Sequence, residues 1–278
     1  MIAPSQRERA AGFRKLHGGP RLLLLPNAWD AASARLFEEE GFEAIGTTSA
    51  GVAFSHGFPD GERMAFPDVI TTIERITRAV RIPVTADIEA GFGETPDGVG
   101  ASIRAVVEAG AVGVNLEDGK ERKELVPVSL HSERIRAARE AASSAGGDVV
   151  INARTDVYLD AIGPPESRFD EAVRRANAYR KAGADCLFVP GVTDAGTIER
   201  LAREIDGPLN VLAGAETPSV RELERFGVAR LSLGSGPMRA ALGLLRRIAR
   251  EIREGGTYGA LTSGALSYAE ANGLFTRS

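Results

Sequence analysis

Eight short apolar runs, each followed by a longer amphipathic run, constrain the fold of this 278-residue chain more than any other feature. Such alternation is typical of strands that each lead into a helix with one buried face. The apolar runs span residues 21–27, 43–49, 82–89, 113–118, 148–156, 186–191, 209–214 and 230–236. A doubly wound sheet is the competing interpretation, but an eighth unit and the lack of a domain break favour closure. The sequence therefore predicts an α/β protein, a (β/α)₈ TIM barrel.

The chain ends in a long amphipathic run and a separate tail. We expect residues 1–255 to form a single barrel catalytic domain with an N-terminal helix, and residues 256–278 to be an appendage. Pro237 stands where a proline suits the start of a helix. An apolar stripe follows it, made of Leu242, Leu245, Ile248 and Ile252. This stripe could pack on its own barrel or on a neighbouring chain.

Composition excludes several classes of protein. With 43% hydrophobic and 26% charged residues, the chain can bury a large core. Its net charge of −4 and interleaved charges show no basic patch for nucleic acid. The single cysteine, Cys186, fits a reducing compartment, and no run resembles a secretory signal or a membrane span. We predict a cytoplasmic protein that binds neither nucleic acid nor membrane.

Polar residues stand at the carboxyl ends of the predicted strands, where barrels of this class carry their active sites. Asp87 and Glu89 are two residues apart, so on one strand both side chains would share a face. The same spacing relates Asn115 to Glu117, and Asn152 to Arg154. We therefore expect carboxylates and one arginine to converge from three adjacent strands. The expected set is Asp87, Glu89, Glu117, Asp118 and Asp156, with Arg154.

Carboxylates gathered in this way repel one another unless a positive charge offsets them. A hard divalent cation suits them, because Mg²⁺ prefers one or two carboxylates and keeps several waters. No HxxxH pattern or cysteine pair offers a zinc site. Structural ion pairs, such as Arg154 with Asp156 or Glu117, are the alternative explanation for single members of the set.

Five stretches resemble the isocitrate lyase/phosphoenolpyruvate mutase superfamily, particularly its short phosphonomutase-like members. They are TTSAGVAFSHGFPDGE, ADIEAGFG, GVNLEDG, INARTD and GADCLFVPG, and the resemblance runs from about residue 20 to residue 250. It implies Mg²⁺, with Mn²⁺ as an alternative, and a small α-oxocarboxylate substrate that reacts through an enolate of the pyruvate type.

The resemblance also implies roles for single residues. Asp87 corresponds to the closest metal ligand, and Glu89 and Glu117 to residues that hold metal-bound waters. Asp60 matches an acidic residue near the metal, and Arg154 the arginine that binds substrate oxygens. We take Arg154, Asp60 and Glu117 as the predicted catalytic residues.

Substrate binding is predicted at two other places. By the same resemblance, Thr48, Ser49 and Ala50 belong to a loop that binds the substrate carboxylate through backbone amides and a hydroxyl. Asn210, at the start of the seventh predicted strand, is counted with them.

The chain departs from its relatives where their reactions differ. The lyases carry a KKCGH-like loop after the fourth strand, but residues 117–132 read EDGKERKELVPVSLHS and hold no cysteine. The mutases' asparagine-containing loop is missing, and Pro190 stands where they have a histidine. We predict a lyase or decarboxylase that cleaves a C–C bond of an α-oxo or α-hydroxy carboxylate. The alternatives are a C–P bond enzyme (a mutase or phosphonopyruvate hydrolase) and a non-catalytic oxoacid-binding barrel.

The resemblance further implies a swapped last helix and a homodimer or homotetramer, with the tail at the contact. Four weaker features have two interpretations each. His56 could be an acid or base or a solvated loop residue, and the loop 119–129, with Lys120 and Lys123, could be a lid that closes over the substrate or a solvated charge run. Cys186 is expected in the core, and LGSGPMR (233–239) is a phosphate loop or, as we favour, a tight turn. None of the four lysines lies on a predicted strand, which argues against Schiff-base chemistry.

Overall fold

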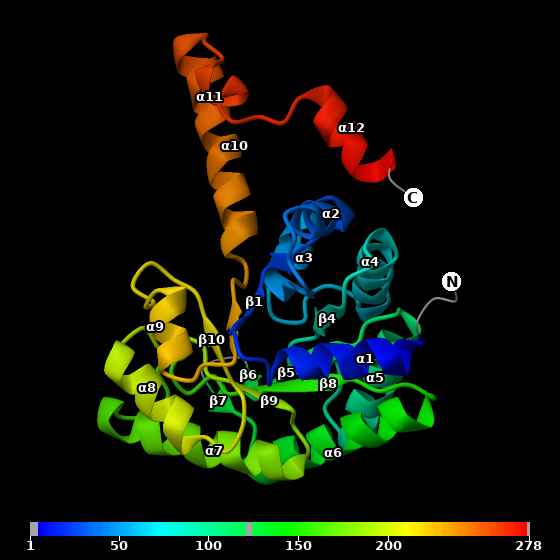
Figure 1. Cartoon of the computed structure of the whole chain (residues 1–278), viewed down its shortest axis with the longest axis vertical. Helices are drawn as coiled ribbons and strands as arrows, with labels where there is room; N and C mark the ends of the chain where they lie inside the picture. Colours follow the sequence, from blue (N-terminus) through cyan, green and yellow to red (C-terminus); the bar gives the residue numbers. More distant parts are fainter. Residues whose placement is uncertain (1–4, 121–123, 277–278) are drawn as a thin grey trace.

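The computed structural model describes residues 5–120 and 124–276, and it confirms the predicted barrel. One parallel sheet runs in the order β1-β11-β10-β9-β8-β5-β4-β3-β2. Its two ends, β1 (Leu23–Leu25) and β2 (Asn27–Ala28), are halves of one strand interrupted at Pro26, so the sheet closes on itself (Figure 1). Proline lacks the N–H that a continuous ladder requires, which accounts for the interruption.

The remaining strands and the helices follow the predicted alternation. The strands are β3 (Ile45–Thr47), β4 (Val84–Asp87), β5 (Gly113–Glu117), β8 (Val150–Arg154), β9 (Cys186–Phe188), β10 (Leu209–Leu212) and β11 (Arg230–Ser232). The helices between them are α2 (Ala31–Glu39), α4 (Phe66–Ala79), α5 (Pro96–Glu108), α6 (Val128–Ser144), α7 (Arg168–Ala182), α8 (Ala195–Glu204) and α9 (Val220–Arg225). After β11 comes α10 (Gly236–Gly255).

Local sequence explains where these helices begin and end. Thr95 caps α5 by accepting a hydrogen bond from the Gly98 N–H at 3.2 Å, and Pro96 follows it in the first turn. Helix α7 ends at Gly183, whose φ of 114° lies in the left-handed region that glycine adopts without strain.

A short helix and a two-stranded ribbon are among the elements that were not predicted. Helix α3 (Ser49–Ser55) fills part of what was expected to be a loop, and a ribbon of β6 (Gly119–Lys120) and β7 (Glu124–Leu125) follows β5. Neither is long enough to show a hydrophobic period in the sequence. Thr48 nevertheless caps α3, because its hydroxyl accepts from the Gly51 N–H at 3.4 Å.

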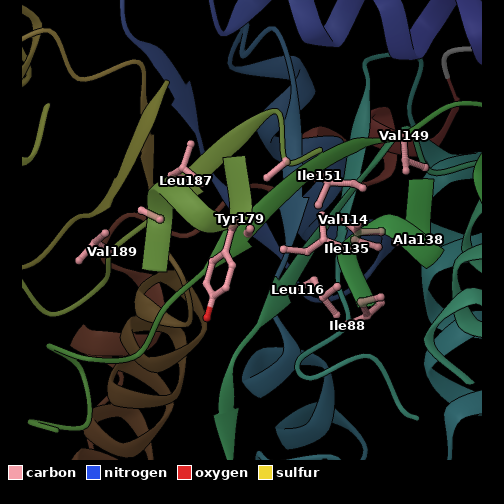
Figure 2. Packing of buried hydrophobic residues seen from close by; sticks show 14 of the residues in the cluster. Ile88, Val114, Leu116, Ile135, Ala138, Val149, Ile151, Tyr179, Leu187 and Val189 are labelled. Carbon is pink, nitrogen blue, oxygen red and sulfur yellow. The ribbon is translucent and has the colours of Figure 1, made fainter. Parts of the chain in front are cut away.

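The main core lies between the strands and the surrounding helices. Val114 and Leu116 of β5 point outward and are fully buried against α6, where Ile135 and Ala138 lie (Figure 2). Asn115 and Glu117 alternate with them and face the barrel interior. Burial of each large apolar side chain contributes about 1.5–3 kcal/mol, so the outward face stabilises the barrel while the inward face is free to carry chemistry.

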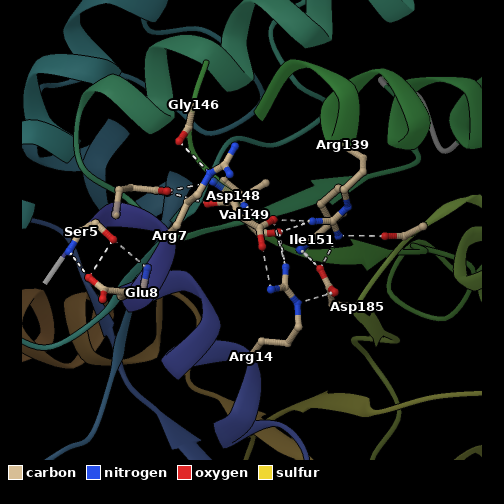
Figure 3. Close-up of polar contacts among 12 residues, drawn as sticks. Ser5, Arg7, Glu8, Arg14, Arg139, Gly146, Asp148, Val149, Ile151 and Asp185 are labelled. Atoms are coloured by element: carbon tan, nitrogen blue, oxygen red, sulfur yellow. Dashed lines mark hydrogen bonds and ion pairs between the residues drawn. The ribbon is translucent and has the colours of Figure 1, made fainter. Parts of the chain in front are cut away.

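Helix α1 (Gln6–Leu16) covers the amino ends of the strands. Figure 3 shows its Arg14 and the Arg139 of α6 converging on Asp148 and Asp185. Arg14 lies 2.7 Å from Asp148 and 2.9 Å from Asp185, and Arg139 pairs with the same two aspartates. The guanidinium groups of Arg14 and Arg139 therefore serve chiefly to tie α1 to β8 and β9.

Helix α10 does not cover the barrel that it follows. It projects away from the strands (Figure 1), and Met238 is its one buried residue. Leu242 (43%), Leu245 (59%) and Ile252 (42%) of the predicted stripe are exposed. Beyond it lie α11 (Gly259–Thr262) and α12 (Tyr268–Thr276), and Arg35 of α2 donates to the Leu274 carbonyl of α12 at 2.7 Å. None of the helices in the described ranges has the length and apolar character needed to cross a membrane.

Two buried histidines predict a loss of stability in acid. Burial lowers the pKa of His17 to about 4 and that of His131, fully buried on α6, to about 3. Both histidines have a pKa near 6.5 in the unfolded chain, so as the pH falls the unfolded chain is protonated at these residues before the folded protein is. Their contribution is complete above pH 6.5 and is lost as the pH falls toward 4. At pH 5 the loss is about 2 kcal/mol for each histidine.

Urea unfolding at pH 7 and pH 5 checks this. We expect His131→Gln to reduce the difference in unfolding free energy between the two pH values by about 2 kcal/mol. Equal differences for the wild type and the variant would contradict it.

Candidate active site

Glu117 and Arg154 end two adjacent strands and form an ion pair at the carboxyl end of the barrel. They are register partners on β5 and β8, and Arg154 Nη1 lies 2.6 Å from Glu117 Oε2. Arg154 also donates to Asp156 through Nε at 2.6 Å and Nη2 at 3.1 Å. Both structural pairs considered from the sequence are thus present, and together they hold the guanidinium in one orientation.

Asp87 ends β4 beside this pair. Its N–H donates to the Thr47 hydroxyl at 2.8 Å, and its Oδ2 accepts from the Ser49 N–H at 3.1 Å. Its Oδ1 is buried and has no hydrogen-bond partner among the described residues. A buried carboxylate oxygen without a partner is costly, so this atom is suited to receive a ligand.

Glu89 reaches the cluster from a strained loop and not from the strand. The prediction that Asp87 and Glu89 share a strand face was wrong, because β4 ends at Asp87 and Glu89 has a φ of 52°. Glu62 and Phe92 are also left-handed, with φ of 54° and 50°. The Glu62 N–H donates to Glu89 Oε2 at 2.6 Å, and the Phe92 N–H to Glu62 Oε1 at 2.7 Å. Left-handed backbone at non-glycine residues costs roughly 1–3 kcal/mol each and is concentrated at functional sites.

Burial, and then crowding, raises the pKa values of these carboxylates. Burial raises the pKa of Glu89 to about 8, and Asp60 and Asp87 add to the rise. Burial also raises the pKa of Glu117 well above its usual range, although Arg154 opposes it. The pKa of Asp60 is raised by burial and by Asp87. When ionised, these carboxylates therefore carry more negative charge than Arg154 alone offsets.

Asp118 does not belong to the cluster, so the expected convergence of five carboxylates was wrong by one. Its side chain is fully buried on the outer side of the barrel, where Oδ2 accepts from Tyr179 at 2.5 Å and from Arg175 at 3.0 Å. The alternation along the chain after Glu117 turns it toward α7. Its other oxygen accepts from the Asp156 N–H at 3.0 Å, so it supports the site from outside.

The predicted substrate-binding residues lie in two places. Thr48, Ser49 and Ala50 form the cap and first turn of α3, next to Asp87. Asn210 is fully buried inside the barrel, and its amide exchanges hydrogen bonds with Ser232 at 3.1 Å. The structure therefore brings the α3 residues to the carboxylates, while Asn210 lies with Ser232 in the interior.

The weaker candidates have structural explanations. Asn27 Oδ1 accepts from the N–H groups of Leu233 and Gly234 at 2.9 and 2.8 Å, so the turn after β11 uses these donors within the chain. Cys186 is buried, and burial raises the pKa of its thiol to about 12. His56 is an exposed residue at the end of α3. Of the proposed lid, Lys123 lies outside the described residues.

Sequence reasoning missed Glu62, which positions Glu89. It ends the stretch TTSAGVAFSHGFPDGE, and a second acidic residue so close to Asp60 was the available signal. It also passed over Arg230, a charged residue at the start of an otherwise apolar strand.

The donor set fits a divalent cation held mostly through water. Within the described ranges, no three acidic, histidine or cysteine side chains are placed to hold a metal ion directly. Asp87 Oδ1 is available, and the charge on Glu89 and Glu117 is under-compensated. A cavity of about 10 Å³ lined by Asp87, Glu89 and Ser49 has room for one water. One direct carboxylate with water-mediated neighbours is the arrangement that Mg²⁺ favours.

The fold and site thus define a (β/α)₈ barrel with an acidic, arginine-bearing centre at the carboxyl ends of its strands. The family model for phosphoenolpyruvate phosphomutase matches residues 13–253. The chain belongs to this family, within the isocitrate lyase/phosphoenolpyruvate mutase superfamily.

Three known proteins illustrate the family's range. The 2-methylisocitrate lyase of Bacillus subtilis is 30% identical over 265 residues, covering 91% of this chain and 84% of that protein. A Burkholderia cenocepacia structure described as a candidate lyase/mutase is 39% identical, with a TM-score of 0.90 over 98% of this chain and 97% of that one. A phosphonopyruvate hydrolase solved with oxalate and Mg²⁺ is 25% identical, with a TM-score of 0.83 over 96% and 94%.

Proposed function

We propose that this protein is a Mg²⁺-dependent lyase or decarboxylase that cleaves a C–C bond of a small α-oxo or α-hydroxy carboxylate through an enolate. One observation supports it most. A buried, unpartnered oxygen of Asp87 lies in a crowded carboxylate cluster beside an arginine whose orientation is fixed. Such a centre suits a cation and an anionic oxygen ligand together.

Each residue has a role that follows from its place. Asp87 would hold the cation directly, and Glu89 and Glu117 would hold its waters. When bound, the cation supplies Lewis-acid polarisation of the substrate's oxo and carboxylate oxygens. The Ala50 N–H in the first turn of α3 would bind the substrate carboxylate at low entropic cost, since the neighbouring Ser49 and Gly51 N–H groups already donate to Asp87 and Thr48. Arg154 would hold positive charge where the enolate oxygen becomes negative.

The bond-breaking step conserves electrons in both routes. The pair of the broken C–C bond is left on the carbon next to an oxo or carboxylate group, which delocalises it as an enolate, and that carbon then takes up a proton. In the retro-aldol route, a base removes the hydroxyl proton of the leaving fragment, which departs as a carbonyl compound. In the decarboxylase route, CO₂ departs and no such base is needed.

The C–P bond reaction is the second candidate, favoured by the description of the matching family model. Against it, Pro190 is buried at the end of β9, at the position where the resemblance places a histidine in the mutases. A proline side chain can neither donate nor accept a proton. We therefore rank C–C cleavage first.

A substrate screen tests the proposal. The protein with Mg²⁺ is incubated with oxaloacetate, alkylmalates, methylisocitrate and phosphonopyruvate, and products are followed by NMR with EDTA-treated enzyme as control. We expect EDTA-sensitive release of pyruvate or another oxoacid from a C–C substrate. Efficient conversion of phosphonopyruvate, either to phosphoenolpyruvate or to pyruvate and phosphate, would contradict it, and oxoacid binding without any turnover would favour the binding-protein alternative.

We also propose that α10 packs against a second copy of the chain, giving a dimer or tetramer. Its exposed leucines leave an apolar face that the chain's own barrel does not cover. Light scattering at micromolar concentration should show a species at least twice 29.4 kDa. Leu242→Glu with Leu245→Glu should dissociate it, whereas Leu159→Glu, at an exposed leucine of a loop, should not. A species of 29.4 kDa alone for the wild type would refute this.

A further inference from the structure

Arg230 is a fully buried cation at the start of β11 whose side chain lies inside the barrel. Its Nε donates to the Ser232 hydroxyl at 3.2 Å and its Nη2 to the Asn115 side-chain oxygen at 3.3 Å. Its Nη1 has no partner, and no ion pair joins it to a carboxylate in the part of the chain that the structure describes. Arg230 is thus a buried charge supported only by neutral groups.

Such an arrangement is costly for a purely structural residue. A buried charge needs compensation, and well-packed apolar residues of similar size are often as stabilising or more so. Barrel interiors of this class are filled mostly by branched apolar side chains. Burial also lowers the pKa of Arg230 to about 10, which leaves it charged at neutral pH.

The guanidinium lies directly beneath the carboxylate cluster. Asn115, which Arg230 contacts, is the register partner of Asp87 across β4 and β5. Asn115 also accepts from the Asn152 amide at 2.6 Å. Asn115 and Asn152 each stand two residues before a member of the Glu117–Arg154 pair, so they form the layer below it.

Charge balance shows what a cation in this place does. The acidic residues of the site are Asp60, Asp87, Glu89, Glu117 and Asp156. When ionised, their charge exceeds that of Arg154 and a divalent cation combined. An anionic substrate would then meet a centre that is still negative.

We propose that Arg230 is a positioning residue that offsets the carboxylate cluster from below, so that the metal-loaded site accepts an anionic substrate. This rests on the function proposed above. Its consequence is a pair of effects of opposite sign. Removing the charge should strengthen the binding of the cation and weaken that of the anion, which general damage to the site would not do.

The test compares Arg230→Met, Arg230→Lys and wild type by calorimetric titration. Mn²⁺ is titrated alone, and oxalate is titrated into the Mn²⁺-loaded protein. Coulomb's law with an effective dielectric constant of about 20 and a separation of about 10 Å gives a change of roughly 300-fold in each affinity, because Mn²⁺ and oxalate each carry two charges. We expect Arg230→Met to bind Mn²⁺ more tightly and oxalate more weakly by about that factor. Arg230→Lys, which keeps the charge, should stay within about three-fold of wild type.

Two further variants make the result decisive. Arg139→Met removes the same charge at the opposite end of the barrel and should change neither affinity. If Arg230→Met does not fold, Ser232→Asp replaces it, because a carboxylate beside Arg230 neutralises the arginine in place. Ser232→Asp should then also tighten the binding of Mn²⁺ and weaken that of oxalate. Unchanged affinities, or two losses together in a folded variant, would overturn the inference. A wild type that binds neither Mn²⁺ nor oxalate would instead overturn the proposed function.

Discussion

Replacing Asp87 with alanine is expected to abolish metal-dependent activity and to lower the affinity for Mn²⁺ by at least about 100-fold, since even outer partners of a metal site cost about 10–100-fold. Asp87 supplies the unpartnered buried oxygen of the site, and its neighbours Glu89 and Glu117 are expected to hold waters. Without it, the other buried oxygen of the described cluster that accepts no hydrogen bond is Glu117 Oε2, which already forms an ion pair with Arg154.

The fold should survive this change. Asp87 is the last residue of β4, and its side chain accepts one hydrogen bond, from the Ser49 N–H. Removing one crowded carboxylate also relieves repulsion with Asp60 and Glu89. Circular dichroism and thermal unfolding should therefore show a folded protein. The control is Asp97→Ala, which removes an exposed carboxylate from the first turn of α5. Equal Mn²⁺ affinities for wild type and Asp87→Ala would make the metal assignment wrong.

Replacing Arg154 with methionine is expected to lower kcat by roughly 10²–10³-fold, the usual effect of removing one donor that stabilises a developing oxyanion. KM should change less, because the negative charge on the substrate oxygen grows between ground state and transition state. The kcat of Arg154→Lys should fall between those of wild type and Arg154→Met. Lysine keeps the charge but loses the planar fork that holds Glu117 and Asp156.

Arg154 also supports the structure, so stability must be measured beside activity. Breaking a buried ion pair from one side costs about 3–5 kcal/mol, because Glu117 and Asp156 are left uncompensated. Kinetics should therefore be read at a temperature where the variant is folded. The matched control is Arg174→Met, whose arginine forms an exposed pair with Glu171 at 2.7 Å. A rise in KM with unchanged kcat would show that Arg154 binds substrate and transition state equally, contrary to the prediction.

Much of this site could be predicted because strand periodicity is local. Asn115 and Glu117, like Asn152 and Arg154, keep the period of two within strands that extend through both residues, and the structure places them as expected. The period failed at Glu89, because the strand ends two residues earlier and a left-handed backbone begins. The prediction also placed Asp118 in the cluster with its neighbour Glu117, although strand alternation turns the Asp118 side chain toward α7.

The sequence alone determined the class of fold and which charged residues stand at the ends of its strands. Eight alternating units and the residues at their strand ends depend on composition and spacing, and these are set by the chain itself. The tertiary structure decided which groups meet across the barrel and with what charge. The Glu62 contact with Glu89 arises between segments far apart in sequence. So do the Asp87 oxygen and the buried Arg230 beneath it, which have no hydrogen-bonding or ion-pair partner, respectively, among the described residues. Hydrogen bonding and burial, which settle whether a charged group is compensated, exist only once those segments are packed together.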